Sequence, residues 1–161
     1  MTKTEEPLTG SPQLDIAMRF AAVVPHIQAM SIEIVSASVG RASMRLPWQS
    51  HLVGNFDEGF LHGGAITTLI DSASGLAVFL AIDPVPPIAT LDLRIDYLRP
   101  PTGHEAVIAE AECYRVTQRI AFVRAVAHHG DPERAIANSA STFKLDSPGQ
   151  PLSSANNERR A

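Results

Sequence analysis

Residues 55–80 read NFDEGFLHGGAITTLIDSASGLAVFL and hold the long apolar segment of this chain. The hydrophobic residues of this segment recur at helical spacing after a His62-Gly63-Gly64 turn. No Lys, Arg or Glu occurs between His62 and Leu80, so a helix here has no charged face and is expected to be mostly buried. Its one carboxylate is Asp71. Because Asp is rarely buried without a partner, Asp71 needs either a hydrogen-bonding neighbour or a chemical role.

Length and composition indicate a single globular domain with polar ends. The chain has 161 residues, of which 45% are hydrophobic and 19% are charged, which is ordinary for a globular protein with a sizeable core. We expect a flexible lead over residues 1–12, one domain over residues 13–145 and a disordered tail over residues 146–161.

The charge and the cysteine content narrow the possible partners and the compartment. The formal net charge of −4 argues against sequence-independent binding of nucleic acid, which needs a basic surface. Cys113 is the single cysteine and can form no internal disulfide, which favours a reducing compartment. Asp71 interrupts the best candidate for a membrane span, and the N-terminal residues contain no apolar signal core. These features predict a cytoplasmic protein that binds neither nucleic acid nor a membrane.

The remaining pattern predicts a short helix and two strands before the long helix, and four strands after it. The short helix is expected to start at Ser11-Pro12 and end near Pro25, with a connector over residues 26–30. The long helix is expected to end near Ile82, before a proline-rich segment. Strands are expected on either side of a turn at residues 39–41, and over residues 89–97, 105–114, 120–128 and 135–145.

Strand 89–97 shows the clearest alternation. A period of two places Thr90, Asp92, Arg94 and Asp96 on one face and Ala89, Leu91, Leu93, Ile95 and Tyr97 on the other. Short turns join the later strands, so they are expected to pair antiparallel. One long apolar helix on one antiparallel sheet is an α+β arrangement. Helix and sheet together leave more apolar surface than one chain covers, which predicts at least a dimer.

Gly63 and Gly64 lie where the long helix is expected to begin. Backbone N–H groups in the first turn of a helix have no internal partner, and the helix dipole adds partial positive charge there. Two glycines let a ligand approach this backbone closely, so the turn can donate to a carbonyl oxygen or an anion. The simpler interpretation is a turn that needs unusual dihedral angles, and a Gly-Gly pair alone favours it.

Asp71 follows Gly64 by seven residues, or about two helical turns. Both residues then share a helix face but lie about 10 Å apart along the axis, at the limit of what one substrate group can bridge. Two such helices packed antiparallel across a dimer axis would bring Gly64 of one chain opposite Asp71 of the other. Alternatively, Asp71 hydrogen-bonds to nearby Ser or Thr side chains and only fixes the packing.

The residues from Asn55 through Gly59, His62-Gly63-Gly64 and Leu69-Ile70-Asp71 resemble the N…G-x-x-H-G-G…L-x-D signature of PaaI-like acyl-CoA thioesterases. These are hotdog-fold proteins, in which an antiparallel sheet wraps a long helix. Residues 89–100, which include Thr90, also resemble the strand that follows the helix in this family. The spacing from Asn55 to His62 is one residue longer than in some members.

The resemblance implies a homodimer or homotetramer with active sites at the subunit interface, an acyl-CoA substrate, and neither cofactor nor metal. The Gly64 N–H would polarise the thioester carbonyl, and Asp71 of the other subunit would be the general base or the nucleophile. Asn55 would position water or the acyl group, Thr90 would orient water, and His62 would shape the mouth of the helix. Further candidates for substrate binding are Gly63, Phe60, Arg94 and Arg99, although Phe60 can equally be a packing residue and the two arginines ordinary surface charges.

Two other functions fit parts of the pattern. A hotdog hydratase or dehydratase would pair a catalytic His with a carboxylate on the helix, but the helix here has no His after His62. A non-catalytic acyl-CoA-binding protein would share the fold and bind the thioester without releasing a thiol. Asn55, Asp71 and Thr90 together favour the enzyme.

Overall fold

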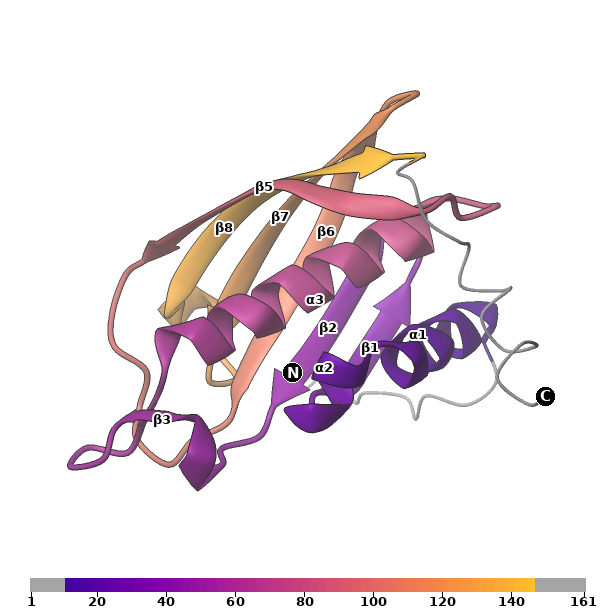
Figure 1. Cartoon of the computed structure of the whole chain (residues 1–161). Helices are drawn as coiled ribbons and strands as arrows, with labels where there is room; N and C mark the ends of the chain where they lie inside the picture. The colour runs from indigo at the N-terminus through magenta and orange to yellow at the C-terminus, as the bar shows by residue number, and fades with distance from the viewer. Residues whose placement is uncertain (1–10, 147–161) are drawn as a thin grey trace, which may run out of the picture.

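The computed structural model describes residues 11–146 as a long helix held against a six-stranded antiparallel sheet (Figure 1). The helices are α1 (Pro12–Val23), α2 (Pro25–Ala29) and α3 (Gly63–Ala81), with 3₁₀ turns η1 (Ser50–Leu52) and η2 (Pro132–Arg134). The strands are β1 (Glu33–Ser38), β2 (Arg41–Leu46), β3 (Val53–Asn55), β4 (Phe60–Leu61), β5 (Ile88–Tyr97), β6 (Val107–Val116), β7 (Ile120–His128) and β8 (Ala137–Leu145). The predicted α+β hotdog arrangement is confirmed.

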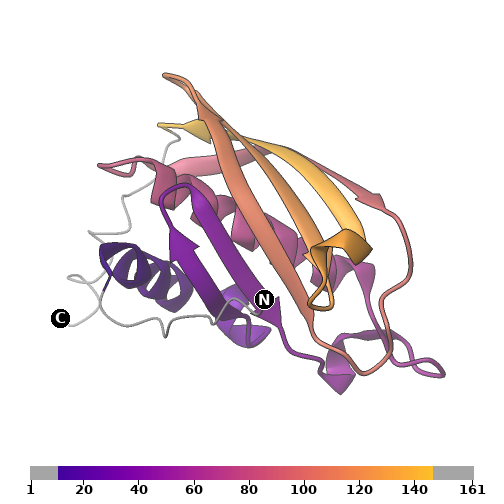
Figure 2. The same cartoon turned by 180° about the vertical axis from the view of Figure 1, so that it is seen from behind.

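The sheet has the strand order β1-β2-β6-β7-β8-β5, and α3 lies along its inner face. Figure 2 shows the outer face of the same sheet, with α3 behind it. The sheet residues beneath α3 are mostly small and buried, namely Ala109, Ala111, Ala121, Ala125, Ala127 and Ala137. Small side chains allow the helix to lie close to the strands, and this contact forms the core.

The helix boundaries follow the predicted signals. Ser11 is the N-cap of α1 and its hydroxyl accepts the Leu14 N–H at 3.2 Å, with Pro12 in the first turn. α3 ends at Ala81, before the proline-rich segment that cannot continue a helix. The expected connector over residues 26–30 is wrong in part, because Pro25 starts the short helix α2 there.

Strand β5 departs from strict alternation at one point. In its pairing with β8, Thr90 lies opposite Phe143 and Asp92 lies opposite Thr142, so Leu91 is an extra, unpaired residue. Such a bulge reverses the side-chain alternation on one side of it. Thr90 therefore faces α3 together with Leu93, and the expectation that Thr90 shares a face with Asp92 is wrong.

Strand β5 also leaves apolar surface at the edge of the sheet. Its outer edge pairs with no other strand among residues 11–146. Leu91, Tyr97 and Leu98 on or beside this edge are 55%, 47% and 54% exposed. An unpaired edge with large apolar side chains is a typical site of strand pairing with another chain.

Helix α3 resembles a membrane span in composition. It has 19 residues and an 18-residue window with a mean hydropathy of 1.5, which is long and apolar enough to cross a membrane. The prediction that Asp71 excludes a span is therefore too strict on composition alone. In this fold 61% of the window is buried inside the molecule, which accounts for its apolar character as a core helix.

Candidate active site

The N-terminus of α3 is capped by the side chain of His62. The His62 Nδ1 accepts the Gly64 N–H at 2.9 Å, and the His62 carbonyl accepts the Ala65 N–H at 2.9 Å. Because Nδ1 accepts a hydrogen bond here, the imidazole carries no proton on this nitrogen. The Gly63 N–H donates to no acceptor among residues 11–146. The turn therefore presents one unused donor and a second donor, the Gly64 N–H, that the His62 ring occupies.

Gly64 is exposed, so a substrate oxygen can reach its backbone N–H by replacing the His62 ring. A Cβ at this position would lie 2.9 Å from His62 Nδ1. Glycine is thus needed for the His62 cap as it stands, in addition to the close ligand approach that the sequence suggested.

Asp71 and Thr90 form the second part of the candidate site. The Thr90 hydroxyl donates to Asp71 Oδ1 at 3.0 Å, and the bulge at Leu91 is what turns Thr90 toward the helix. Asp71 is half-buried. One carboxylate oxygen is thus held by a neutral donor, and Oδ2 has no partner within residues 11–146. This arrangement fixes the orientation of the carboxylate while leaving an acceptor for a proton.

The two parts of the site are separated within one chain. Gly64 and Asp71 both lie on α3, seven residues apart, so their axial separation is about 10 Å. They occupy similar positions around the helix because seven residues are nearly two turns. One chain therefore presents the donor and the carboxylate on one face, but too far apart to act on the same carbonyl group.

Asn55 hydrogen-bonds within its own hairpin and to neither part of the site. Its side-chain oxygen accepts the backbone N–H groups of Asp57 at 3.0 Å and Glu58 at 3.3 Å, and its carbonyl accepts the Gly59 N–H at 2.8 Å. These bonds fold the tip of the β3–β4 hairpin. The longer spacing between Asn55 and His62 in this sequence coincides with that tip.

The other candidate residues lie in three different places. Arg99 lines an apolar pocket of about 440 Å³ together with Gly63 and Tyr97. Arg94 pairs with Asp96 at 3.1 Å and faces away from α3, so it does not join the site within one chain. Phe60 is half-buried in β4.

A second pocket lies on the other side of the α3 N-terminus. Its volume is about 420 Å³, and it is lined by His26, Met30, His51, Leu52, Val53, His62, Gly64, Ala65 and Thr68. One pocket is lined by Gly63 and the other by Gly64, so both border the first turn of α3. Sequence reasoning missed His26 and His51, because they belong to distant segments and no pattern links them to the HGG turn.

Sequence reasoning also missed Tyr97. Its hydroxyl donates to the Gly63 carbonyl at 2.8 Å and lies 3.2 Å from Thr67 Oγ1. Strict alternation would have put Tyr97 and Thr90 on opposite faces of β5. The bulge at Leu91 places both side chains against α3.

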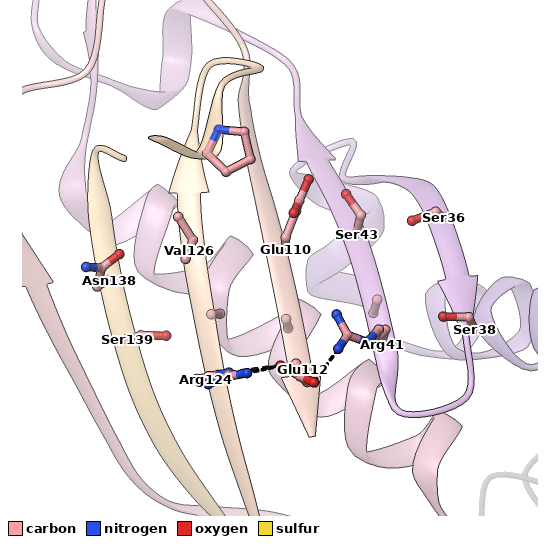
Figure 3. Close-up of a pocket in the computed structure, with 14 residues that line it drawn as sticks. Ser36, Ser38, Arg41, Ser43, Glu110, Glu112, Arg124, Val126, Asn138 and Ser139 are labelled. Atoms are coloured by element: carbon pink, nitrogen blue, oxygen red, sulfur yellow. Dashed lines mark hydrogen bonds and ion pairs between the residues drawn. The ribbon is translucent and has the colours of Figure 1, made fainter. Parts of the chain in front are cut away.

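A polar pocket of about 520 Å³ lies on the outer face of the sheet, away from α3 (Figure 3). Glu112 is placed between Arg124, which donates to its Oε2 at 2.6 and 2.8 Å, and Arg41. The hydrogen bonds from Arg124 hold the pKa of Glu112 below its ordinary value, with charge attraction from Arg124 and Arg41 assisting and burial opposing. These charges are paired with one another and lie on the face opposite Asp71.

Cys113 is not positioned as a nucleophile. It is half-buried, and this burial raises the pKa of its thiol. A raised pKa lowers the fraction of reactive thiolate at neutral pH. No group of three or more His, Cys, Asp or Glu within residues 11–146 is arranged to hold a metal ion.

Comparison with known proteins identifies relatives that share this fold. The sequence profile of the thioesterase superfamily matches residues 58–136. A Pseudomonas aeruginosa protein of known crystal structure is 38% identical, with a TM-score of 0.76 over 83% of this chain and 98% of that chain. The medium/long-chain acyl-CoA thioesterase YigI of Escherichia coli K12 is 28% identical over 139 residues, or 78% of this chain and 88% of YigI. The E. coli PaaI protein of the phenylacetic acid degradation operon shares the fold at 17% identity, with a TM-score of 0.72 over 82% of this chain and 91% of PaaI.

The fold is thus that of the hotdog thioesterases, which are hydrolytic enzymes. The chain belongs to the thioesterase superfamily and is a thioester hydrolase. The resemblance found in the sequence is confirmed at this level.

Proposed function

We propose that the protein hydrolyses acyl-CoA thioesters at composite sites between two subunits. The observation that carries this proposal is the Asp71–Thr90 pair, at 3.0 Å, which holds a half-buried carboxylate on the same helix face as the α3 N-terminus. The similarity to YigI, an acyl-CoA thioesterase, over 78% of this chain supports acyl-CoA as the substrate class.

The unpaired edge of β5 supports the dimer. Two copies of β5 that pair antiparallel about a two-fold axis would continue the sheet and cover Leu91 and Leu98. Each β5 runs along its own α3, since Tyr97 contacts Gly63 and Thr90 contacts Asp71. The two α3 helices would then run antiparallel, with the N-terminus of one near Asp71 of the other.

In the proposed reaction the thioester oxygen accepts the Gly64 N–H in place of the His62 ring. Asp71 of the other subunit removes a proton from a water molecule, and the water oxygen attacks the carbonyl carbon. The tetrahedral intermediate then collapses, the carbon–sulfur bond breaks, and the thiolate of coenzyme A leaves. The backbone donor stabilises the oxyanion, a contribution that is typically worth about 10²–10³ in rate.

Asp71 can act as a base or as the attacking nucleophile, and isotope labelling separates the two. In a single turnover in H₂¹⁸O, a base mechanism puts ¹⁸O into the released acid and none into the protein. A nucleophilic mechanism forms an anhydride with Asp71, and its hydrolysis can leave ¹⁸O in the Asp71 carboxylate. Mass spectrometry of the peptide that contains Asp71 distinguishes them.

The first experiment is thiol release from a panel of acyl-CoAs, with phenylacetyl, benzoyl and C4 to C16 chains. Release by the wild type and its loss in Asp71→Asn would support both the reaction and the role of Asp71. Tight binding of an acyl-CoA without release by the folded wild-type protein would favour the non-catalytic binding protein instead.

A further inference from the structure

The Tyr97 hydroxyl contacts the peptide group that supplies the proposed oxyanion donor. It donates to the Gly63 carbonyl at 2.8 Å. The carbonyl of Gly63 and the N–H of Gly64 belong to the same planar peptide unit. A hydrogen bond to that oxygen therefore polarises the unit and strengthens the N–H as a donor.

Local features give Tyr97 access to this oxygen. A Cβ on Gly63 would lie 3.4 Å from the Tyr97 hydroxyl oxygen, closer than in most contacts, so glycine leaves the approach open. Because of the bulge at Leu91, the side chains of both Thr90 and Tyr97 face α3. Just beyond Tyr97, the Leu98 N–H donates to the Ile136 carbonyl at 2.8 Å, which ties the end of β5 to the chain before β8.

Tyr97 is half-exposed in the single chain, and its hydroxyl has two polar neighbours on α3. The residue is 47% exposed, whereas the core side chains of α3 are nearly all inaccessible. Its hydroxyl also lies 3.2 Å from Thr67 Oγ1, one turn further along the helix. The hydroxyl of this half-exposed tyrosine donates to a carbonyl in the first turn of α3, where it can polarise the peptide group.

We propose that Tyr97 is a positioning residue that polarises the Gly63–Gly64 peptide and so strengthens the Gly64 N–H toward the thioester oxygen. This inference rests on the proposed function for its effect on rate, but the polarisation itself is a property of the substrate-free protein. Cooperative strengthening is about 10–30% of a bond, and a lost oxyanion donor costs about 10²–10³ in rate, so removing the hydroxyl should lower kcat about two- to eight-fold.

The test uses Tyr97→Phe, with Thr67→Val as the matched control. The control removes the second polar neighbour of the Tyr97 hydroxyl and leaves the Gly63 contact in place. In ¹H–¹⁵N NMR spectra of the substrate-free protein, the Gly64 amide proton should move upfield in Tyr97→Phe and stay near its wild-type position in Thr67→Val. In thiol-release assays Tyr97→Phe should lower kcat with KM unchanged.

A double-mutant cycle separates polarisation from a general structural effect. Gly64→Pro removes the N–H, so Tyr97→Phe should produce no further loss of kcat in that background. An unmoved Gly64 amide proton, or equal and independent losses in both backgrounds, would overturn the role of Tyr97. Absence of thiol release by the wild type would instead defeat the proposed function, and the NMR shift would still decide whether Tyr97 polarises the peptide.

Discussion

Asp71 is accommodated in an otherwise uncharged helix because Thr90 donates to one of its oxygens and because its side of α3 is only half-buried. The pair lies within one chain, so the orientation of the carboxylate does not depend on the partner. In the proposed site, the partner would supply the N-terminus of its α3, which would donate to the thioester oxygen. At such a site, the chemistry of Asp71 would thus be prepared by its own subunit and completed by the other.

Replacing Asp71 by Asn should reduce thiol release by about 10²–10⁴, because the amide cannot accept the proton from water. The amide keeps a carbonyl oxygen that accepts the Thr90 hydroxyl, so the fold and the oligomer should be unaffected. Asp92→Asn is the control, because Asp92 lies on the opposite face of β5. Equal activity of Asp71→Asn and the wild type would remove Asp71 from the reaction.

Replacing Thr90 by Val should lower kcat about 10- to 150-fold, because a hydrogen bond to a charged group is worth about 1.5–3 kcal/mol. Thr90→Ser retains the hydroxyl and should keep most of the activity. Steady-state thiol release measures both variants. A loss of activity in Thr90→Ser but not in Thr90→Val would point to the methyl group and to packing.

At the scale of the element, replacing two glycines by alanine should change the stability in opposite directions. Gly75 lies inside α3, and a Cβ there would meet Phe20 at 3.6 Å and Phe143 at 3.8 Å, which are ordinary contacts. Gly75→Ala should stabilise the protein by about 0.5–1 kcal/mol, since glycine is a poor helix former. Gly40 has a φ of +69°, so Gly40→Ala should destabilise it by about 1–2 kcal/mol. Urea unfolding of the two variants checks both signs.

The outer face of the sheet should contribute a pH-dependent part of the stability through Glu112. Its pKa is lower in the folded protein, so the stabilisation is present above the ordinary pKa of a Glu and is lost as the pH falls through the lowered value. Glu112→Gln should therefore be less stable than the wild type at neutral pH, and the difference should vanish in acid. Urea unfolding of Glu112→Gln and the wild type at neutral and acidic pH measures this difference.

The elements were predictable where one local signal determined each boundary. Ser11-Pro12 marked the start of α1, and the proline-rich segment marked the end of α3. The bulge in β5 was not predictable, because an unpaired Leu91 depends on how β5 and β8 pair, and residues 89–97 alternate without interruption in the sequence. The same limit applies to the side chains around the site. The shared helix face of Asp71 and Gly64 was predictable from helical spacing. The orientation of Thr90 and the contact of Tyr97 with α3 were not, because both depend on the bulge.

At the scale of the whole molecule, a composite site predicts recovery of activity when two strongly impaired variants are mixed. Gly64→Pro lacks the donor and Asp71→Asn lacks the base, and proline is tolerated in the first turn of a helix. Random exchange of subunits at equal amounts makes about half of the dimers mixed, and each mixed dimer has one intact site of two. The mixture should therefore reach about a quarter of wild-type activity after denaturation and joint refolding.

Gly64→Ala keeps the N–H and is the matched control for Gly64→Pro. Each impaired variant refolded alone sets the baseline, and size-exclusion chromatography checks that the mixed sample is a dimer or larger. Activity that stays at the baseline in the mixture would place donor and base in the same chain.

The bulge at Leu91 also bears on how such a strand can evolve. Thr90 and Tyr97 are an odd number of positions apart, and the bulge absorbs the extra one. A descendant that lost the Leu91 codon would have an even interval and an unbroken strand, with both side chains still turned toward the helix. Relatives that differ by one codon here could thus keep the same two contacts, and a gap in this strand would be no sign of lost activity.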